Sequence, residues 1–217
     1  MPALNLTTQI LNACSEVFSR HPRYALADQA IRKIVDFIPG NSALPDILAK
    51  VSVIKTLYAT PFYDIFSFAK HVISVSEFDR FLQNGDFAAV NRIRKGHGIK
   101  LKVSTKEIDL YSFSTKYCSF HNPLSYPIYN NLVANLVTKL NSRCRFSPGL
   151  QRSDLLDYET YRDAIDAMVE SLDLRTYGYK SLDQGLWVLA KYHSVDRLGV
   201  KTKDDQWLMD QVSRIVN

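Results

Sequence analysis

The sequence of 217 residues predicts an all-α fold. Apolar residues recur at spacings of three and four along nearly the whole chain, which is the period of a helix with one buried face. No segment shows the convincing alternation of apolar and polar residues that is typical of a half-buried strand. Turn-forming pairs such as Pro39-Gly40 and Asn84-Gly85 fall where the periodic patterns stop.

The periodic stretches define the predicted helices of a multi-helix bundle. They cover Thr7–Ser19, Tyr24–Ile38, Pro45–Tyr58, Phe62–Val75, Ser76–Leu82, Asp86–Ile93, Thr105–Phe120, Asn131–Leu140, Tyr158–Leu172, Leu182–His193 and Lys203–Val216. We interpret residues 1–217 as a single all-helical domain. The stretch 146–154 is the best candidate for a seam between two lobes, because it contains Pro148 and Gly149 and has little periodicity.

The composition leans toward polyanionic partners. The net charge is +5, an excess that is small for a chain of this length. No stretch approaches the roughly 18 uninterrupted apolar residues of a membrane helix. The first residues lack the basic flank and apolar block of a signal peptide. We therefore expect a cytoplasmic monomer with no membrane partner.

The three cysteines predict neither a disulfide framework nor a thiolate metal site. Cys14, Cys118 and Cys144 are odd in number, widely separated and without CxxC spacing. We expect them to behave as small apolar residues, and we expect neither a metal nor a cofactor.

The stretch Thr105–Phe120 is predicted to carry a lysine on a narrow polar stripe. Ser104 and Glu107 have the spacing of a capping box, which predicts a helix start near Thr105. At helical spacing the apolar residues cover most of the circumference. The remaining stripe holds Ser112, Thr115, Lys116 and Ser119.

Two interpretations of Lys116 follow from this pattern. If the stripe borders a cleft, desolvation by the surrounding aromatic residues favours the neutral amine and makes Lys116 available as a nucleophile. If the stripe faces water, Lys116 is an ordinary solvated lysine, which is the commoner outcome for a charged residue.

A rigid loop and a helix cap follow the lysine. Pro123 and Pro127 each fix a φ angle, which favours an extended connection. Asn130 or Asn131 is then expected to cap the next helix, since Asn is among the best N-cap residues. A polar side chain at this positive helix end could also meet charge that develops in a substrate.

The stretch from Ser112 to Pro123, together with Tyr126–Asn130, resembles the helix-hairpin-helix (HhH-GPD) DNA glycosylases, in particular their lysine-bearing, 8-oxoguanine-type branch. The resemblance implies a two-lobed helical fold and a bifunctional glycosylase/lyase. Such an enzyme flips a modified base out of double-stranded DNA. Lys116 matches the nucleophile that attacks the sugar carbon and forms a Schiff base. Asn130 lies where the family has an aspartate.

Two departures from that family bear on activity. Asn130 cannot carry the negative charge that supports an oxocarbenium ion, so cleavage by this chain is expected to be slow or absent. The Gly-x-Gly hairpin is missing from its usual place, although Gly96-His97-Gly98 has the spacing further upstream. A non-catalytic DNA-binding protein of the same fold is therefore the alternative, and a helical interaction protein unrelated to DNA is a third hypothesis.

A basic loop precedes the lysine helix. Between Phe87 and Ser104 every charged residue is positive, which favours contact with a DNA backbone. The expected DNA-contacting residues are Arg92, Arg94, Lys95, His97, Lys100, Lys102, His121 and Asn122. A solvated loop is the alternative, and a helix C-cap is the alternative for His121 and Asn122. Trp187, Tyr192 and His193 could line a base pocket, with core packing as the alternative.

Overall fold

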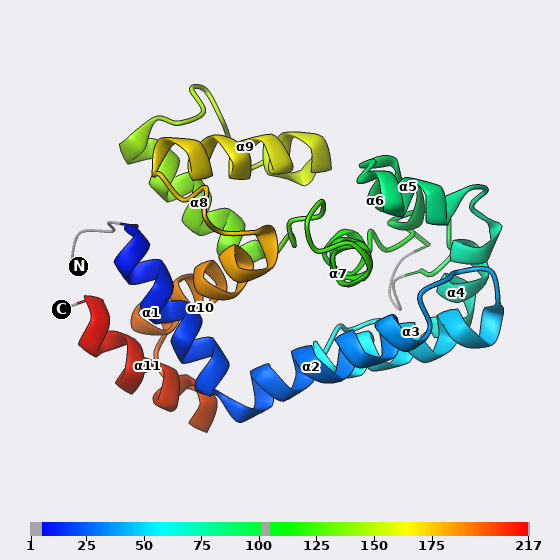
Figure 1. The fold of residues 1–217 in the computed structure, drawn as a ribbon, viewed down its shortest axis with the longest axis horizontal. Helices are drawn as coiled ribbons and strands as arrows, with labels where there is room; N and C mark the ends of the chain where they lie inside the picture. Colours follow the sequence, from blue (N-terminus) through cyan, green and yellow to red (C-terminus); the bar gives the residue numbers. More distant parts are fainter. Residues whose placement is uncertain (1–5, 101–104, 217) are drawn as a thin grey trace. The chain divides into compact units, whose positions relative to one another are not determined.

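The computed structural model describes residues 6–100 and 105–216 and is all-helical over them, so the predicted fold class is confirmed (Figure 1). The helices are α1 (Thr8–Arg20), α2 (Pro22–Phe37), α3 (Leu44–Leu57), α4 (Ile65–Ser74), α5 (Phe78–Asn84), α6 (Ala88–Ile93), α7 (Tyr111–His121), α8 (Asn131–Cys144), the 3-10 helix η1 (Asp154–Leu156), α9 (Tyr158–Ser171), α10 (Tyr179–Leu198) and α11 (Lys203–Val216). Within these described ranges the β structure consists of an isolated bridge between Lys100 and Glu107.

The chain divides into two compact units. Unit 1 combines the N-terminal segment up to Ala25 with the residues from Tyr129 onward, and unit 2 is Leu26–Ile128. The boundaries thus lie before Leu26 and after Ile128. The predicted seam at 146–154 falls inside unit 1, between α8 and α9.

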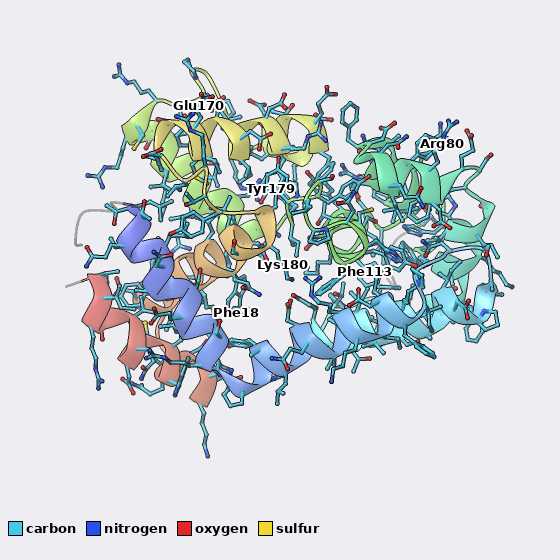
Figure 2. All side chains as sticks on the ribbon, in the orientation of Figure 1. Phe18, Arg80, Phe113, Glu170, Tyr179 and Lys180 are labelled. Atoms are coloured by element: carbon cyan, nitrogen blue, oxygen red, sulfur yellow. The ribbon has the colours of Figure 1, made fainter. Side chains whose placement is uncertain are left out.

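Unit 1 is built around α10, which packs against α1, α8 and α11. Gly185 permits the close approach of α1, since a Cβ there would lie 2.5 Å from Leu11 Cδ1 and 3.0 Å from the Leu11 carbonyl oxygen. Phe18, labelled in Figure 2, meets the ring of Trp187 edge-on at 6.2 Å. Trp187 is half-buried and also contacts Tyr24, and Tyr192 is buried, so both residues pack within unit 1.

Unit 2 is built around α7, against which α3 and α6 pack. Every residue from Phe113 to Phe120 is buried. Phe113, labelled in Figure 2, stands edge-on to Phe62 at 4.8 Å and to Phe68 at 5.1 Å. These edge-to-face pairs are the favoured aromatic geometry and add to the apolar burial.

Most helix limits agree with the sequence prediction within two residues, and α11 and the start of α8 are as predicted, whereas α10 extends beyond the predicted Leu182–His193 at both ends. The predicted start of α7 near Thr105 is wrong, because this helix begins at Tyr111 with Leu110 at its N-cap. Ser104 lies outside the described residues, and Glu107 makes bonds other than a helix cap. Along 6–100 and 105–216, we find no helix with the length and hydropathy needed to cross a membrane.

Candidate functional site

Lys116 is buried, with 7% of its surface exposed. Its Nζ donates to Ser112 Oγ at 2.7 Å and to the Ser112 carbonyl oxygen at 3.3 Å, one helical turn back. The same Nζ lies 5.4 Å from the centre of the Tyr58 ring. Lys116 is therefore held in a defined position beside a hydroxyl and an aromatic face.

Most of the polar stripe of α7 shares this burial, with Ser112 half-buried at its start. Thr115 and Ser119 are almost completely buried, and Thr115 Oγ1 donates to the Ser112 carbonyl oxygen at 3.1 Å. The alternative in which this stripe faces water is therefore wrong. Its members from Thr115 onward lie on a helix that is buried over nearly its whole length, a consequence of packing that periodicity alone does not reveal.

Asn130 caps α8 as predicted. Its extended backbone places Oδ1 2.8 Å from the backbone nitrogen of Leu132, whose N–H it accepts. The cap satisfies one of the backbone N–H groups at the start of the helix. Asn130 belongs to unit 1 and Lys116 to unit 2.

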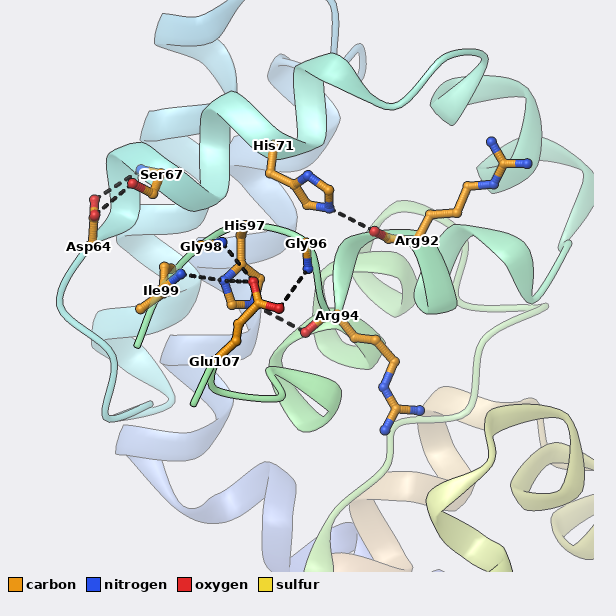
Figure 3. A network of polar contacts seen from close by, with 10 residues as sticks. All are labelled: Asp64, Ser67, His71, Arg92, Arg94, Gly96, His97, Gly98, Ile99 and Glu107. Atoms are coloured by element: carbon orange, nitrogen blue, oxygen red, sulfur yellow. Dashed lines mark hydrogen bonds and ion pairs between the residues drawn. The ribbon is translucent and has the colours of Figure 1, made fainter. Parts of the chain in front are cut away.

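The glycines of the basic loop bind a carboxylate of the protein itself (Figure 3). The N–H groups of Gly96 and Gly98 donate to the two oxygens of Glu107 at 3.2 and 2.7 Å. Burial of the carboxyl would raise its pKa, but these two hydrogen bonds and the nearby His97 lower the pKa of Glu107 overall. These two amides of the basic loop are thus occupied by an internal anion.

Acidic residues after the loop also neutralise part of its charge. Arg94 makes a bidentate contact with Asp109, at 2.9 and 2.6 Å, and its guanidinium stacks 3.9 Å from the centre of the Tyr111 ring. Lys95 lies 3.6 Å from the same carboxylate. Arg92 and Lys100 are exposed, and Lys102 lies outside the described residues.

The structure does not present His97 to a ligand. Its side chain is fully buried, Nε2 lies 3.1 Å from the Arg94 carbonyl oxygen, and Nδ1 accepts the Ile99 N–H at 3.1 Å. Burial lowers its pKa, although Glu107 and the Arg94 carbonyl act the other way. The predicted DNA contact of His97 is wrong for this reason, since the ring ties the loop together.

His121 and Asn122 also serve the structure of unit 2. Asn122 Nδ2 donates to the carbonyl oxygens of Leu82 and Gln83, at 2.9 and 3.3 Å. Burial, together with the charge of Lys50, lowers the pKa of His121 to about 3, so the ring is neutral at pH 7. Both residues line a hollow of about 610 Å³ with Asp79 and other groups, and they offer no positive charge to a phosphate.

A second buried lysine was missed by the sequence reasoning. Lys50 is completely buried in α3, and its Nζ donates to the Gly40 carbonyl oxygen at 2.7 Å and to Asn41 Oδ1 at 2.8 Å. Tyr117 donates to the same Asn41 oxygen at 2.5 Å, while the Asn41 amide donates to Asp79 at 2.6 Å. Burial lowers the pKa of Lys50 to about 8, against the opposing effect of Asp79.

One signal in the sequence marks this network. Lys50 interrupts the apolar run of Ile47–Ile54, where a helix buried over much of its circumference has no room for a solvated ammonium. Across residues 6–100 and 105–216, no cluster of three or more His, Cys, Asp or Glu side chains could hold a metal ion.

The comparisons with known proteins identify a family and a relative. The HI_0787_N family, described as an N-terminal domain, matches residues 8–125. A Haemophilus influenzae protein described as uncharacterized is 28% identical over 155 residues, which cover 71% of each chain. No solved structure matches the chain.

These findings correct the family expected from the sequence. The stretch around Lys116 resembles the helix-hairpin-helix glycosylases, but the family that matches is a different one, and that assignment is wrong. The resemblance rests on a short pattern, which consists of a lysine, a proline-containing loop and a capped helix. This chain has that pattern around α7 but matches a different family. Since the match covers more than half of the sequence, this chain belongs to the HI_0787_N family.

Proposed function

We propose that the protein excises a modified base from double-stranded DNA, with Lys116 as the nucleophile. The observation that carries the proposal is the position of the Lys116 amine, buried beside Ser112 Oγ and the Tyr58 ring. An enclosed amine is protected from the strong hydration that makes lysine a poor nucleophile in water. The net charge of +5 and the exposed Arg92 and Lys100 support a polyanionic substrate.

The proposed reaction forms one bond and breaks another. The neutral amine of Lys116 attacks C1′ of the flipped nucleotide, and the bond between C1′ and the base nitrogen breaks with its electron pair on the base. The amine gives up a proton, and the base takes up one proton as it leaves. Opening of the sugar ring then gives a Schiff base to Lys116, which water hydrolyses or which β-elimination resolves with strand scission.

Asn130 sets the expected rate. Its amide caps α8 but has no negative charge with which to stabilise a cationic sugar. We expect slow cleavage by the chain as it stands. Asn130→Asp retains a good cap and adds a negative charge, so the change in its rate measures whether residue 130 takes part in the reaction.

Trapping with borohydride tests the chemistry, because hydride reduces the C=N bond of the Schiff base to a stable amine. Duplexes that carry different modified bases should give a covalent adduct with the natural protein and with Asn130→Asp. The adduct should be lost in Lys116→Arg, which keeps the positive charge but removes the nucleophile. Lys50→Arg is the matched control at the other buried lysine and should retain the adduct.

The second candidate is a non-catalytic DNA-binding protein, favoured by the engagement of Asn130 in its cap. It predicts salt-sensitive binding of duplex DNA with no adduct, even in Asn130→Asp. An adduct that survives in folded Lys116→Arg would rule out Lys116 as the nucleophile.

A further inference from the structure

A pocket in unit 1 gathers basic side chains from two helices and a loop. It has a volume of about 420 Å³ and lies between α8 and α10. The lining residues are Leu132, Asn135, Leu136, Thr138, Lys139, Arg152, Ala190, His193, Ser194 and Arg197. Among these described lining residues there is no Asp or Glu, so the charged side chains that line the pocket are basic.

The two helices contribute in the same pattern. On α8 the lining includes positions 132, 135, 136 and 139, and on α10 it consists of positions 190, 193, 194 and 197. Each set follows the spacing of one helix face. The apolar members Leu136 and Ala190 are buried, while Lys139 and Arg197 are exposed. The pocket thus has an apolar base and a basic opening.

Arg152 is held in place before any ligand arrives. Its Nε donates to Asn135 Oδ1 at 2.8 Å, and its Nη2 donates to the Tyr129 hydroxyl at 2.8 Å and to Asn131 Oδ1 at 2.9 Å. A guanidinium has five N–H donors, and these bonds use three of them. The two hydrogens of Nη1 remain available to an acceptor, on a group whose position is already fixed.

The other cations have no internal counter-ion. Within residues 6–100 and 105–216, neither Lys139 nor Arg197 forms an ion pair, in contrast to Arg94 of the basic loop. His193 has Lys139 and Asp196 as its charged neighbours. Three permanent positive charges without a carboxylate among the lining residues leave the pocket complementary in charge to an anion.

We infer that this pocket binds a phosphate group. The free Nη1 group of the fixed Arg152, a lysine and a second arginine supply the charge-assisted donors that a tetrahedral oxyanion accepts. The volume suits a small ligand, and the phosphate could come from a phosphorylated small molecule or from a DNA backbone. The inference does not depend on Lys116 or on the excision proposed above.

Calorimetric titration of the full chain with inorganic phosphate tests the site. Lys139→Gln combined with Arg197→Gln should weaken phosphate binding at least tenfold, a loss of about 1.4 kcal/mol or more. Arg175→Gln combined with Arg214→Gln is the matched control, since it removes two exposed positive charges of unit 1 outside the pocket. Arg152→Lys keeps the charge but loses the hydrogen bonds that fix the position of the cation, and should also weaken binding.

A parallel titration with unmodified duplex DNA distinguishes the two sources. If the natural ligand is a DNA phosphate, the pocket variant loses DNA affinity. The slope of its affinity against salt concentration also becomes shallower, by the amount expected for the loss of about one to two phosphate contacts. If the ligand is a small phosphorylated molecule, the pocket variant and the control bind DNA equally. The inference is overturned if pocket variant and control bind phosphate equally, or if the natural protein binds neither phosphate nor DNA. The adduct at Lys116 is scored separately, so failure of one proposal leaves the other intact.

Discussion

Glu107 Oε1 accepts the backbone N–H of Gly98 at 2.7 Å, so a carboxylate from the segment before α7 binds an amide of the basic loop. The Ile108 N–H donates to the Ile99 carbonyl oxygen at 2.8 Å and brings that segment back along the loop. The loop between α6 and α7 is thus closed on itself by its own acid.

Replacing Glu107 with Gln is expected to destabilise the protein by about 1–2 kcal/mol at pH 7, because two amides lose a charged acceptor. The pKa of Glu107 is lowered in the folded state, so its stabilisation is complete above the unfolded pKa of about 4.3 and is lost as the pH falls through the folded pKa. Urea unfolding at several pH values measures the difference. A gap between variant and natural protein that is as large at pH 2.5 as at pH 7 would contradict this account.

Replacing Asp109 with Asn should release the charge of Arg94 and Lys95. If the loop contacts DNA, duplex affinity is expected to rise severalfold at low salt, with a steeper dependence on salt concentration. Fluorescence anisotropy at several salt concentrations measures both. Asp173→Asn removes an exposed carboxylate of unit 1 and serves as the control. Equal affinities for the two variants would mean that this loop does not touch DNA.

The buried amine of Lys50 predicts a pH effect of the same sign as that of Glu107, but in the alkaline range. Its folded pKa of about 8 is below the usual value, so the unfolded chain binds this proton more tightly between about pH 8 and 10.4. The contribution of Lys50 to stability therefore rises with pH through that window, by about 1–2 kcal/mol. Lys50→Met has no ionisable side chain at this position. Unfolding of both proteins at pH 7.5 and 9.5 therefore measures the pH-dependent contribution of Lys50 to the free energy of unfolding. If the difference in unfolding free energy between the natural protein and Lys50→Met is the same at both pH values, the pKa of Lys50 is not lowered.

Gly185 is expected to be intolerant of a side chain. Gly185→Ala should destabilise unit 1 by about 2 kcal/mol or more despite the better helix propensity of Ala, since the new Cβ meets Leu11 from α1. Gly149→Ala is a useful contrast, because its φ is +82° and no atom lies within 4 Å. There the cost is backbone strain, about 1 kcal/mol. Thermal unfolding that ranks Gly149→Ala as the worse variant would contradict the packing of α1 on α10.

His193 reports on the basic pocket of unit 1. Burial lowers its pKa, and Lys139 lowers it further, while Asp196 acts in the opposite direction. Lys139→Gln is therefore expected to raise the pKa of His193, and Asp196→Asn is expected to lower it. The NMR chemical shifts of the imidazole ring protons, followed against pH, measure this pKa. Arg214→Gln should leave it unchanged. A pKa that does not respond to Lys139→Gln would place that ammonium away from the ring.

The helices were predictable because each depends on residues that are close together in the sequence. The apolar period marks the helices, and Asn130 marks the start of α8 through its cap chemistry. The start of α7 was predicted too early because Ser104 and Glu107 imitate a capping box. Glu107 instead bonds to Gly96 and Gly98, a choice made by the loop rather than by local spacing.

The candidate site was predictable only in part. Lys116 stood out because it is the long residue on a narrow stripe, but whether that stripe met water could not be read from one helix. The pairing of Arg94 with Asp109 spans 15 positions, and Lys50 meets Asn41 and Tyr117 through folding of α3 against α7. Such contacts depend on which faces of the helices pack against each other in the folded protein.

By itself the sequence determined an all-helical chain, most of its helix limits, the cap at Asn130 and the unusual position of Lys116. The tertiary structure decided that Lys116 and Lys50 are buried, that the basic loop is partly neutralised, and that the N-terminal helix joins the C-terminal helices in unit 1. The reason is physical. Helix formation follows from neighbours within a few residues, whereas burial and charge pairing follow from packing between distant segments, which leaves little trace in local periodicity.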